Sequence, residues 1–190
     1  MSAFDPKRTL EECKEGFYMK NLNLFILMFF SLSIIGPLAY AEQDVLTPES
    51  IKRFYKRATE VQKEGVSKII QFNDKHSHSG FVMNFKMPLV DENGGAVNYM
   101  ENTYNKTQLL NLIRNTELAQ EALVDIETEV LSIELSEDMQ SAHVKDRTTS
   151  KFQFEEGEPM IMSQKCSDYL VLNEGIIQFM ASHCEQLISN

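Results

Sequence analysis

The feature that most restricts the fold of this chain is a twofold alternation of apolar and polar residues that begins near Val124 and continues almost to the end. Residues 136–138, 155–159 and 173–175 interrupt it and carry the acidic, Gly, Pro and Asn side chains that are typical of turns. Alternation with this spacing predicts four strands, and because the loops are short, consecutive strands should be antiparallel. The predicted strands are 122–135, 141–154, 160–172 and 176–187.

The first half of the folded region predicts helices and a hairpin. Thr47 and Pro48 have the residue types of a helix start, and an apolar stripe at helical spacing continues to Ile69. Residues 73–80 are polar and read as a turn. Strands at 81–87 and 96–100 follow, joined by a turn at 91–95, and then a second helix that Asn105 caps and that fades after Leu118. The predicted order is α-β-β-α-β-β-β-β, an α+β fold.

The last predicted hairpin resembles that of a known superfamily. Residues 167–183 read SDYLVLNEGIIQFMASH, a strand with an Asp, a turn with Gly, and a strand that closes on Ala-Ser-His. This segment, the hairpin around 135–144 and the order of elements resemble the nuclear transport factor 2-like superfamily, which includes ketosteroid isomerase-like and SnoaL-like proteins. The resemblance implies a strongly bent antiparallel sheet that wraps helices into a cone with a pocket at its mouth. One departure is Ile176 or Ile177 where relatives often have Trp, which this chain lacks altogether.

The N-terminal segment predicts export. Residues 22–35 are almost entirely apolar, Gly36 and Pro37 follow, and residues 39–41 read Ala-Tyr-Ala, the small-x-small pattern that signal peptidase accepts. We therefore expect a signal peptide that is cleaved after Ala41, with Met19 as the functional start and residues 42–190 as one periplasmic or secreted domain. The alternative is an uncleaved N-terminal anchor.

Charge excludes some partners. The net charge is −10, and it stays −10 without residues 1–41, which hold equal numbers of acids and bases. Such a domain repels nucleic acid and anionic lipid, so we expect neither as a partner, and no membrane span after cleavage.

Two cysteines remain after Cys13 is removed with the signal peptide. A three-residue loop at 173–175 would place Leu172 opposite Ile176, and Cys166 and Cys184 would then share one face, two residues away from direct opposition. A bulge or a diagonal pairing would bring them within bonding distance, so we expect a disulfide. The alternative is two buried thiols. Cys166 as a nucleophile with His143 or His183 is disfavoured, because a disulfide would block it.

Asp168 is the main candidate for acid–base chemistry. In this register it shares a face with Leu170 and Met180, whereas His183 lies on the other face, so an Asp168–His183 dyad should not form. Burial would raise the pKa of Asp168 and make it a usable base. The alternative is an Asp168 paired with Lys145 or Arg147 on the neighbouring strand.

The other site candidates follow from these interpretations. In an enzyme, Tyr99, Tyr104 or Tyr169 would donate a hydrogen bond to a developing oxyanion. The weak catalytic candidates are Asp168, Tyr169 and His183, and the pocket candidates are Tyr99, Tyr104, Asp168 and Met180.

A histidine pair gives the one metal-like pattern. His76 and His78 would project to the same side of a strand, but no third ligand is tied to them by spacing, so a solvated loop is the default. We expect neither a metal nor a cofactor.

Both faces of the last hairpin carry apolar residues, which indicates that each face contacts something. The favoured function is therefore an exported, non-enzymatic module that forms a homodimer through the outer sheet face and binds a small apolar ligand or a protein partner. The alternatives are a cone-pocket enzyme of the isomerase, cyclase or dehydratase type and an accessory subunit of a cell-envelope assembly.

Overall fold

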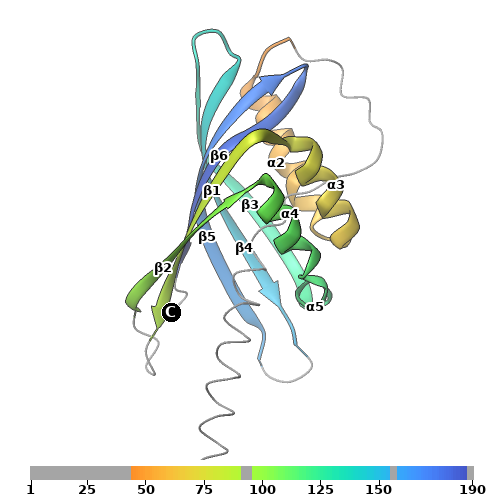
Figure 1. Cartoon of the computed structure of the whole chain (residues 1–190), viewed down its shortest axis with the longest axis vertical. Helices are drawn as coiled ribbons and strands as arrows, with labels where there is room; N and C mark the ends of the chain where they lie inside the picture. Colours follow the sequence, from red (N-terminus) through yellow and green to blue (C-terminus); the bar gives the residue numbers. More distant parts are fainter. Residues whose placement is uncertain (1–43, 91–95, 155–157, 188–190) are drawn as a thin grey trace, which may run out of the picture.

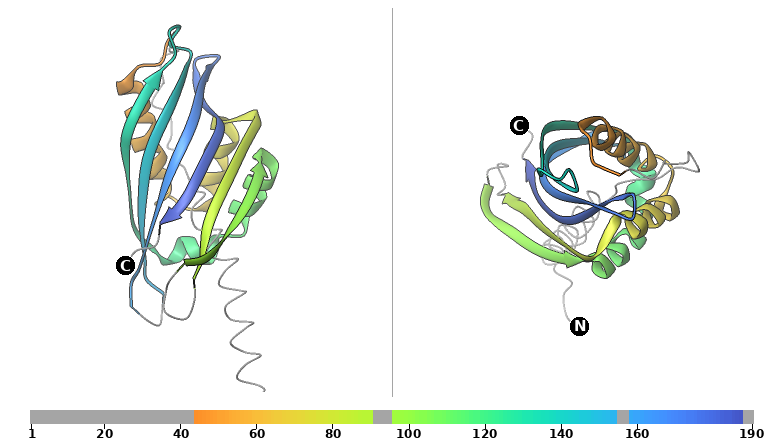
Figure 2. Two further views of the ribbon diagram at one scale, coloured as in Figure 1. Left: turned by 90° about the vertical axis from the view of Figure 1, so that its left-hand side faces the viewer. Right: turned by 90° about the horizontal axis from the view of Figure 1, so that it is seen from above.

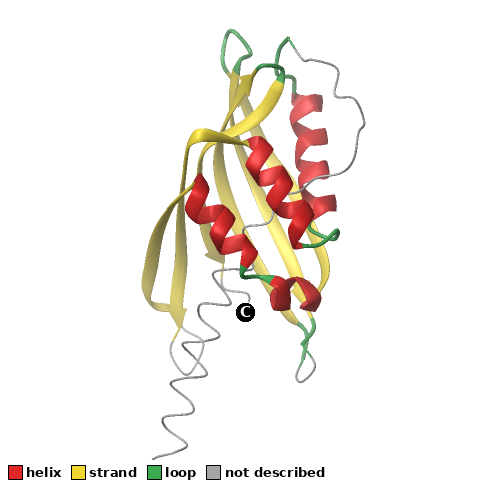
Figure 3. Cartoon of the chain, turned by 45° about the vertical axis from the view of Figure 1, so that its right-hand side comes forward, coloured by secondary structure: helices red, strands yellow, loops and turns green. Residues whose placement is uncertain are grey.

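The structure is a computed structural model that describes residues 44–90, 96–154 and 158–187. Four helices lie on one face of a six-stranded sheet (Figures 1 and 3). The predicted signal peptide lies outside the described residues, as do the turn at 91–95 and part of the turn at 155–159. None of the helices in the described ranges has the length and hydropathy that a membrane span requires.

The helices depart from the two predicted ones. Thr47 caps the first helix, as expected, through a reciprocal pair of hydrogen bonds with Ser50. Gly65, whose φ of 96° lies in the region that favours glycine, ends the first apolar stripe and starts a new helix. Asn105 caps the third helix in the same way, with Gln108. The helices are α2 (Pro48–Val61), α3 (Val66–His76), α4 (Lys106–Arg114) and α5 (Glu117–Ala122).

The turn predicted at residues 73–80 is wrong. Helix α3 continues to His76 and the first strand starts at once at Ser77. The helix persists because Phe72 and His76 pack against Phe54 of α2, with ring centroids 5.4 and 5.3 Å from that of Phe54. The polar Asn73 is buried within the helix and donates to the carbonyl of Ile69. Polar composition was therefore a misleading signal, since these side chains are satisfied inside the core.

The strands form a mixed sheet in the order β2-β1-β6-β5-β4-β3. The four C-terminal strands are antiparallel to their neighbours, as predicted, but β1 pairs in parallel with β6, which corrects the expectation of an entirely antiparallel sheet. The strands are β1 (Ser77–Val90), β2 (Ala96–Asn105), β3 (Leu123–Leu135), β4 (Ser141–Phe152), β5 (Met160–Asn173) and β6 (Ile176–Leu187).

The sheet curls around the helices, as the view from above shows (Figure 2). Its inner face and the apolar faces of α2, α3 and α4 form the core, to which aromatic side chains contribute the largest buried volumes. Among them, Phe54 and Tyr55 come from α2, Phe85 from β1 and Phe152 from β4. Polar side chains on the inner face are therefore removed from water, and the candidate site is built from them.

Candidate functional site

A small cavity lies between the inner face of the sheet and helices α3 and α4. Its volume is about 30 Å³, close to the space that one water molecule occupies in the liquid. Its wall is apolar except for a group of polar side chains from β4, β5 and β6, with an amide from α3. The lining residues are Asn73, Ser77, Phe81, Met83, Leu109, Asp146, Gln164, Cys166, Asp168, Phe179, Ser182 and Cys184.

Two buried carboxyl groups face this cavity from neighbouring strands. Asp146 on β4 is opposite Cys166, and Asp168 on β5 is opposite Val144, so the two acids are diagonal neighbours on the inner face. They are 3% and 2% exposed. Neither Lys nor Arg occurs among the described lining residues, so the cavity offers these acids no counter-charge.

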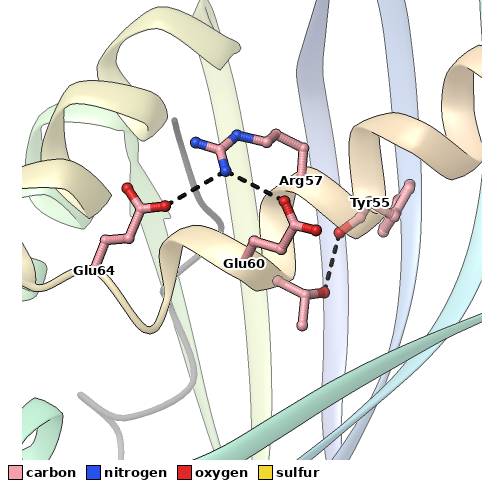
Figure 4. Close-up of polar contacts among 5 residues, drawn as sticks. Tyr55, Arg57, Glu60 and Glu64 are labelled. Carbon is pink, nitrogen blue, oxygen red and sulfur yellow. Dashed lines mark hydrogen bonds and ion pairs between the residues drawn. The ribbon is translucent and has the colours of Figure 1, made fainter. Parts of the chain in front are cut away.

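Asp168 accepts two hydroxyl hydrogen bonds. The Tyr55 hydroxyl on α2 donates to its Oδ2 at 2.5 Å, and the Ser182 hydroxyl on β6 donates to its Oδ1 at 2.5 Å. Helix α2 presents Tyr55 to the sheet through its buried stripe. Figure 4 shows the polar contacts along this part of α2: the Tyr55 carbonyl accepts from the Thr59 hydroxyl, and Arg57 contacts Glu60 and Glu64.

Asp146 is less well satisfied. The Thr148 hydroxyl donates to its Oδ1 at a long 3.5 Å. Its Oδ2 is buried and accepts no hydrogen bond from a donor in the described part of the chain, although the protonated carboxyl group hydrogen-bonds to Asp168. A buried oxygen without a partner carries a desolvation cost of about 1–3 kcal/mol, and it is a natural contact point for a ligand.

The pKa values of these groups follow from their environments. Burial raises the pKa of Asp168, although the hydrogen bonds from Ser182 and Tyr55 favour its ionised form. Burial, followed by the nearby Asp168 charge, raises the pKa of Asp146 to about 9. The same two causes raise the pKa of Tyr55 well above its ordinary value. At neutral pH Asp146 therefore holds its proton, and Asp168 takes part in three hydrogen bonds, with Asp146, Tyr55 and Ser182.

The expected disulfide is present. Cys166 and Cys184 are direct cross-strand partners with Cα atoms 4.1 Å apart, and both are buried. The Ser182 hydroxyl lies 3.3 Å from the Cys184 sulfur, so the disulfide adjoins the carboxyl pair.

The register that produces this pairing differs from the predicted one. The turn of the last hairpin has two residues, Glu174 and Gly175, with φ values of 51° and 73°, so the three-residue loop was wrong. Met180 is the extra residue of a bulge on β6, and one bulge brings the cysteines into direct opposition. Because the bulge reverses which residues face inward, Ile177 and Phe179 join the face of Asp168 instead of the opposite one.

The predicted partners of Asp168 separate into two groups. His183 is exposed on the outer face, so the prediction that it cannot reach Asp168 is confirmed. The alternative pairing with Lys145 or Arg147 is wrong, because these cations lie on the exposed outer face of β4 while Asp168 points inward. Asp168 is buried with a raised pKa, as expected for a carboxyl on an apolar face.

The structure places the other candidates away from the cavity. Tyr99 is 46% exposed on β2, under the Lys86 ammonium, and Tyr104 packs at the edge of the core. Tyr169 stacks on His143, with ring centroids 4.8 Å apart. Met180 is half-buried at the bulge. The tyrosine that contacts Asp168 is Tyr55, which the sequence presents only as one member of an apolar stripe.

The histidine pair is divided between two environments. His76 is buried at the end of α3, where its Nδ1 lies 2.7 Å from the Ile177 carbonyl, whereas His78 is half-buried and its Nδ1 accepts from the Gly80 amide. Burial lowers the pKa of His76 to about 4, so this ring is neutral. Among the described residues one close group has metal-binding side chains, Cys166, Asp168 and Cys184, and the disulfide engages both of its sulfurs.

Comparisons with known proteins concern the fold. No family model matches the chain, and no curated protein matches it in sequence. Several solved structures are similar, among them the following three. A ketosteroid isomerase-like protein from Erwinia carotovora has 13% identity and a TM-score of 0.43, covering 68% of this chain and 85% of its own. A nuclear transport factor 2-like protein of unknown function from Prochlorococcus has 15% sequence identity and a TM-score of 0.45, and the match covers 66% of this chain and 85% of that protein. Aln2 from a Streptomyces species has 14% sequence identity and a TM-score of 0.47, and the match covers 75% of this chain and 94% of that protein.

These neighbours are of the class that the sequence resemblance implied, nuclear transport factor 2-like and ketosteroid isomerase-like proteins. The likeness is one of fold, and such folds host unrelated functions. The chemistry of this protein has to be argued from its own cavity.

Proposed function

We propose that this protein is a non-enzymatic binding module whose ligand places a small hydrogen-bond donor, such as a protonated amine, against the Asp146–Asp168 pair. The observation that carries the proposal is the buried Oδ2 of Asp146, which accepts no hydrogen bond from a protein donor and belongs to a residue that lines the cavity. A donor placed there would satisfy this oxygen and approach the Asp168 carboxyl group at the same time.

Charge complementarity favours a cationic donor. The cavity is lined by two carboxyl groups together with amides and hydroxyls, and its described lining residues include neither Lys nor Arg, so a negative charge on the carboxyl pair has no opposite charge beside it. A buried charge that is left without an opposite charge is costly, so a ligand that brings a positive charge gains the most from entering.

The size of the cavity restricts the ligand. A volume of about 30 Å³ accommodates an ammonium-sized head group, and the apolar wall formed by Phe81, Leu109 and Phe179 suits a short hydrocarbon body next to it. A larger ligand would require α3 and α4 to move away from β1. The favoured ligand is therefore a small alkylamine or the amine end of a longer molecule.

A wider groove elsewhere is a weaker candidate. It lies between α2 and β3, has a volume of about 470 Å³, and is lined by Lys52, Lys56 and Lys63 together with Glu60 and Glu127. Lys63 already pairs with Asp125 at 2.7 Å, and both side chains are at least half exposed. Exposed, mutually compensating charges of this kind select a ligand poorly.

Thermal melting with two matched ligand series tests the proposal. Methyl- to butylammonium should raise the melting temperature at millimolar concentration, and the corresponding alcohols should not. The variant Asp168→Asn, which removes the charge, should lose this effect, whereas Glu129→Gln on exposed β3 should keep it. Equal effects of amines and alcohols, or an unchanged response in a folded Asp168→Asn protein, would contradict the proposal.

An enzyme with Asp168 as general base is the second candidate function. Its specific support is the raised pKa of Asp168 together with the Tyr55 hydroxyl at 2.5 Å, a donor next to a base. Deuterium exchange into a small cyclic ketone, followed by nuclear magnetic resonance, would test it. Exchange that Asp168→Asn abolishes without unfolding the protein would favour the enzyme over the binding module.

We also propose that the protein forms a homodimer through the outer face of the sheet. Ile161 on β5 is 52% exposed, and Tyr169 and Val171 on the same face are half-buried. Apolar side chains in this position gain from cover by a second copy. Light scattering should give twice the chain mass at micromolar concentration, and Ile161→Asp should reduce it to the monomer mass; a monomeric wild-type protein would overturn this part.

Export remains a prediction from the N-terminal segment, and the disulfide is compatible with it, because disulfides persist in oxidising compartments. Mass spectrometry of the protein recovered from its host should give an N-terminus at Glu42. An intact segment would instead favour an anchored subunit of an envelope assembly.

A further inference from the structure

We infer that the chain binds one zinc ion when its disulfide is reduced, with Cys166, Cys184, Asp168 and Asp146 as the four ligands. The inference concerns the dithiol form and does not depend on the ligand proposed for the oxidised form. It rests on four side chains that three adjacent strands bring to one place.

The strand register assembles the ligand set. Cys166 is opposite Cys184 on one side and opposite Asp146 on the other, so these three residues form one row across β4, β5 and β6. Asp168 follows Cys166 by two residues and therefore points to the same face. All four residues are buried and line the same cavity.

The distances suit a single ion. One ligand atom from each of Cys166, Asp168 and Cys184 lies within 4.8 Å of the other two, which is the scale of the edges of a zinc coordination shell with bonds of about 2.0–2.3 Å. Small rotations of the two cysteine side chains are enough to separate the sulfurs after reduction. The fourth ligand is supplied by Asp146, whose Oδ2 is buried and has no hydrogen-bond partner within the described ranges.

The donor set and the charge favour zinc. Two thiolates and two carboxylates form a tetrahedral set of the kind that Zn²⁺ accepts, whereas Mg²⁺ and Ca²⁺ prefer oxygen alone. The cavity has neither Lys nor Arg among its described lining residues, so a divalent cation would be the positive charge that these ligands face, and it would offset two of their four negative charges. The hydroxyls of Tyr55 and Ser182, which already bond Asp168, would hold that carboxylate in place.

The chemistry balances with a dithiol reductant. Two electrons and two protons from the reductant convert the Cys166–Cys184 disulfide into two thiols, and the reductant becomes a disulfide. Zinc then replaces the thiol protons, so at least two protons are released for each ion bound. Oxidation of the thiols would expel the ion and restore the present structure.

Cobalt spectroscopy on the reduced full chain tests the inference. Cys13→Ser removes the remaining cysteine, dithiothreitol reduces the disulfide, and the reductant is removed without oxygen before Co²⁺ is added. The expected result is a sulfur-to-cobalt charge-transfer band that saturates at one ion per chain, tetrahedral visible bands, and displacement of both by Zn²⁺. The oxidised protein should show none of these signals.

Variants separate a built site from free thiols. Asp146→Asn should weaken Co²⁺ binding at least tenfold while Glu129→Gln leaves it unchanged, and Cys184→Ser should abolish the charge-transfer band. If the reduced chain unfolds, circular dichroism should show that zinc restores the folded signal. The inference is overturned if the reduced protein gives no tetrahedral spectrum, if Asp146→Asn binds as tightly as the wild-type chain, or if an unfolded reduced chain stays unfolded with zinc.

Discussion

Two buried titratable groups of this protein contrast in how well the fold satisfies them. His76 has aromatic neighbours in Phe54 and Phe72, and its Nδ1 bonds the Ile177 carbonyl, so a neutral ring has what it needs. The Asp146–Asp168 pair is as deeply buried, yet it leaves one carboxyl oxygen without a partner and one charge without a cation. A satisfied buried group stabilises a fold, whereas an unsatisfied one marks a place where a ligand can bind.

The largest expected effect on stability concerns His76, the buried group whose contacts are satisfied. His76→Ala removes a packed ring and a buried hydrogen bond, and it should lower the free energy of unfolding by about 3 kcal/mol. Urea denaturation followed by circular dichroism measures this change. The matched control is His183→Ala, an exposed histidine on β6, which should change stability by less than about 0.5 kcal/mol. Similar losses for the two variants would remove the distinction between them.

Tyr55→Phe should have the next largest effect, about 2 kcal/mol of destabilisation at neutral pH. The substitution keeps the buried ring but leaves the buried Asp168 carboxyl group with one hydroxyl donor fewer. Tyr99→Phe, at an exposed position, serves as the control. A Tyr55→Phe protein as stable as the wild type would mean that this hydrogen bond contributes nothing to stability.

The smallest expected effect is the pH dependence of stability, to which Asp146 and His76 should contribute in opposite directions. Asp146 ionises near 3.8 when unfolded but near 9 when folded, so between these values the native state holds more protons and stability falls as pH rises. His76 acts in the opposite direction between about pH 6.5 and pH 4. In this range the imidazole is protonated in the unfolded chain but neutral in the folded one, so stability falls as pH falls.

The two contributions therefore offset each other between about pH 4 and 6.5, and from about 6.5 to 9 that of Asp146 remains, with Asp168, whose pKa burial also raises, acting in the same direction. Asp146 accounts for a decline in stability of at most about 1.4 kcal/mol per pH unit across this upper range. Urea midpoints at half-unit steps would show it. Asp146→Asn should flatten the decline, and a decline that survives this substitution would assign it to another group.

The sequence predicted the local parts of the fold better than the long-range ones. The four C-terminal strands begin and end within two residues of their predicted positions, because turn residues such as Gly175 specify the chain reversals locally. The parallel pairing of β1 with β6 could not be predicted from the sequence, since the local residue pattern of neither strand indicates which strand it pairs with. Polar residues 73–76 were misleading because two of them, Asn73 and His76, are buried and find their hydrogen-bond partners inside the fold, while Asp74 and Lys75 form the exposed side of the helix.

The sequence likewise predicted only part of the candidate site. Burial of Asp168 and the disulfide followed from alternation on the last hairpin. Asp146 had a similar signal that was not used: it alternates with Val144 and Thr148 on β4, and all three face inward. That Asp146 lies next to Cys166 depends on which strands pair and in what register, and the contact from Tyr55 depends on how α2 docks. Neither is encoded in local spacing.

The parallel pair of β1 and β6 has a consequence for how the chain folds. It joins segments that are roughly a hundred residues apart, so closing the sheet there carries a large loop-closure entropy and should be a late, slow event. Until β6 is available, the β1–β2 hairpin has no neighbour on its other edge and the four-strand meander cannot dock on it. A nascent chain would therefore remain incompletely folded until β6 has been synthesised.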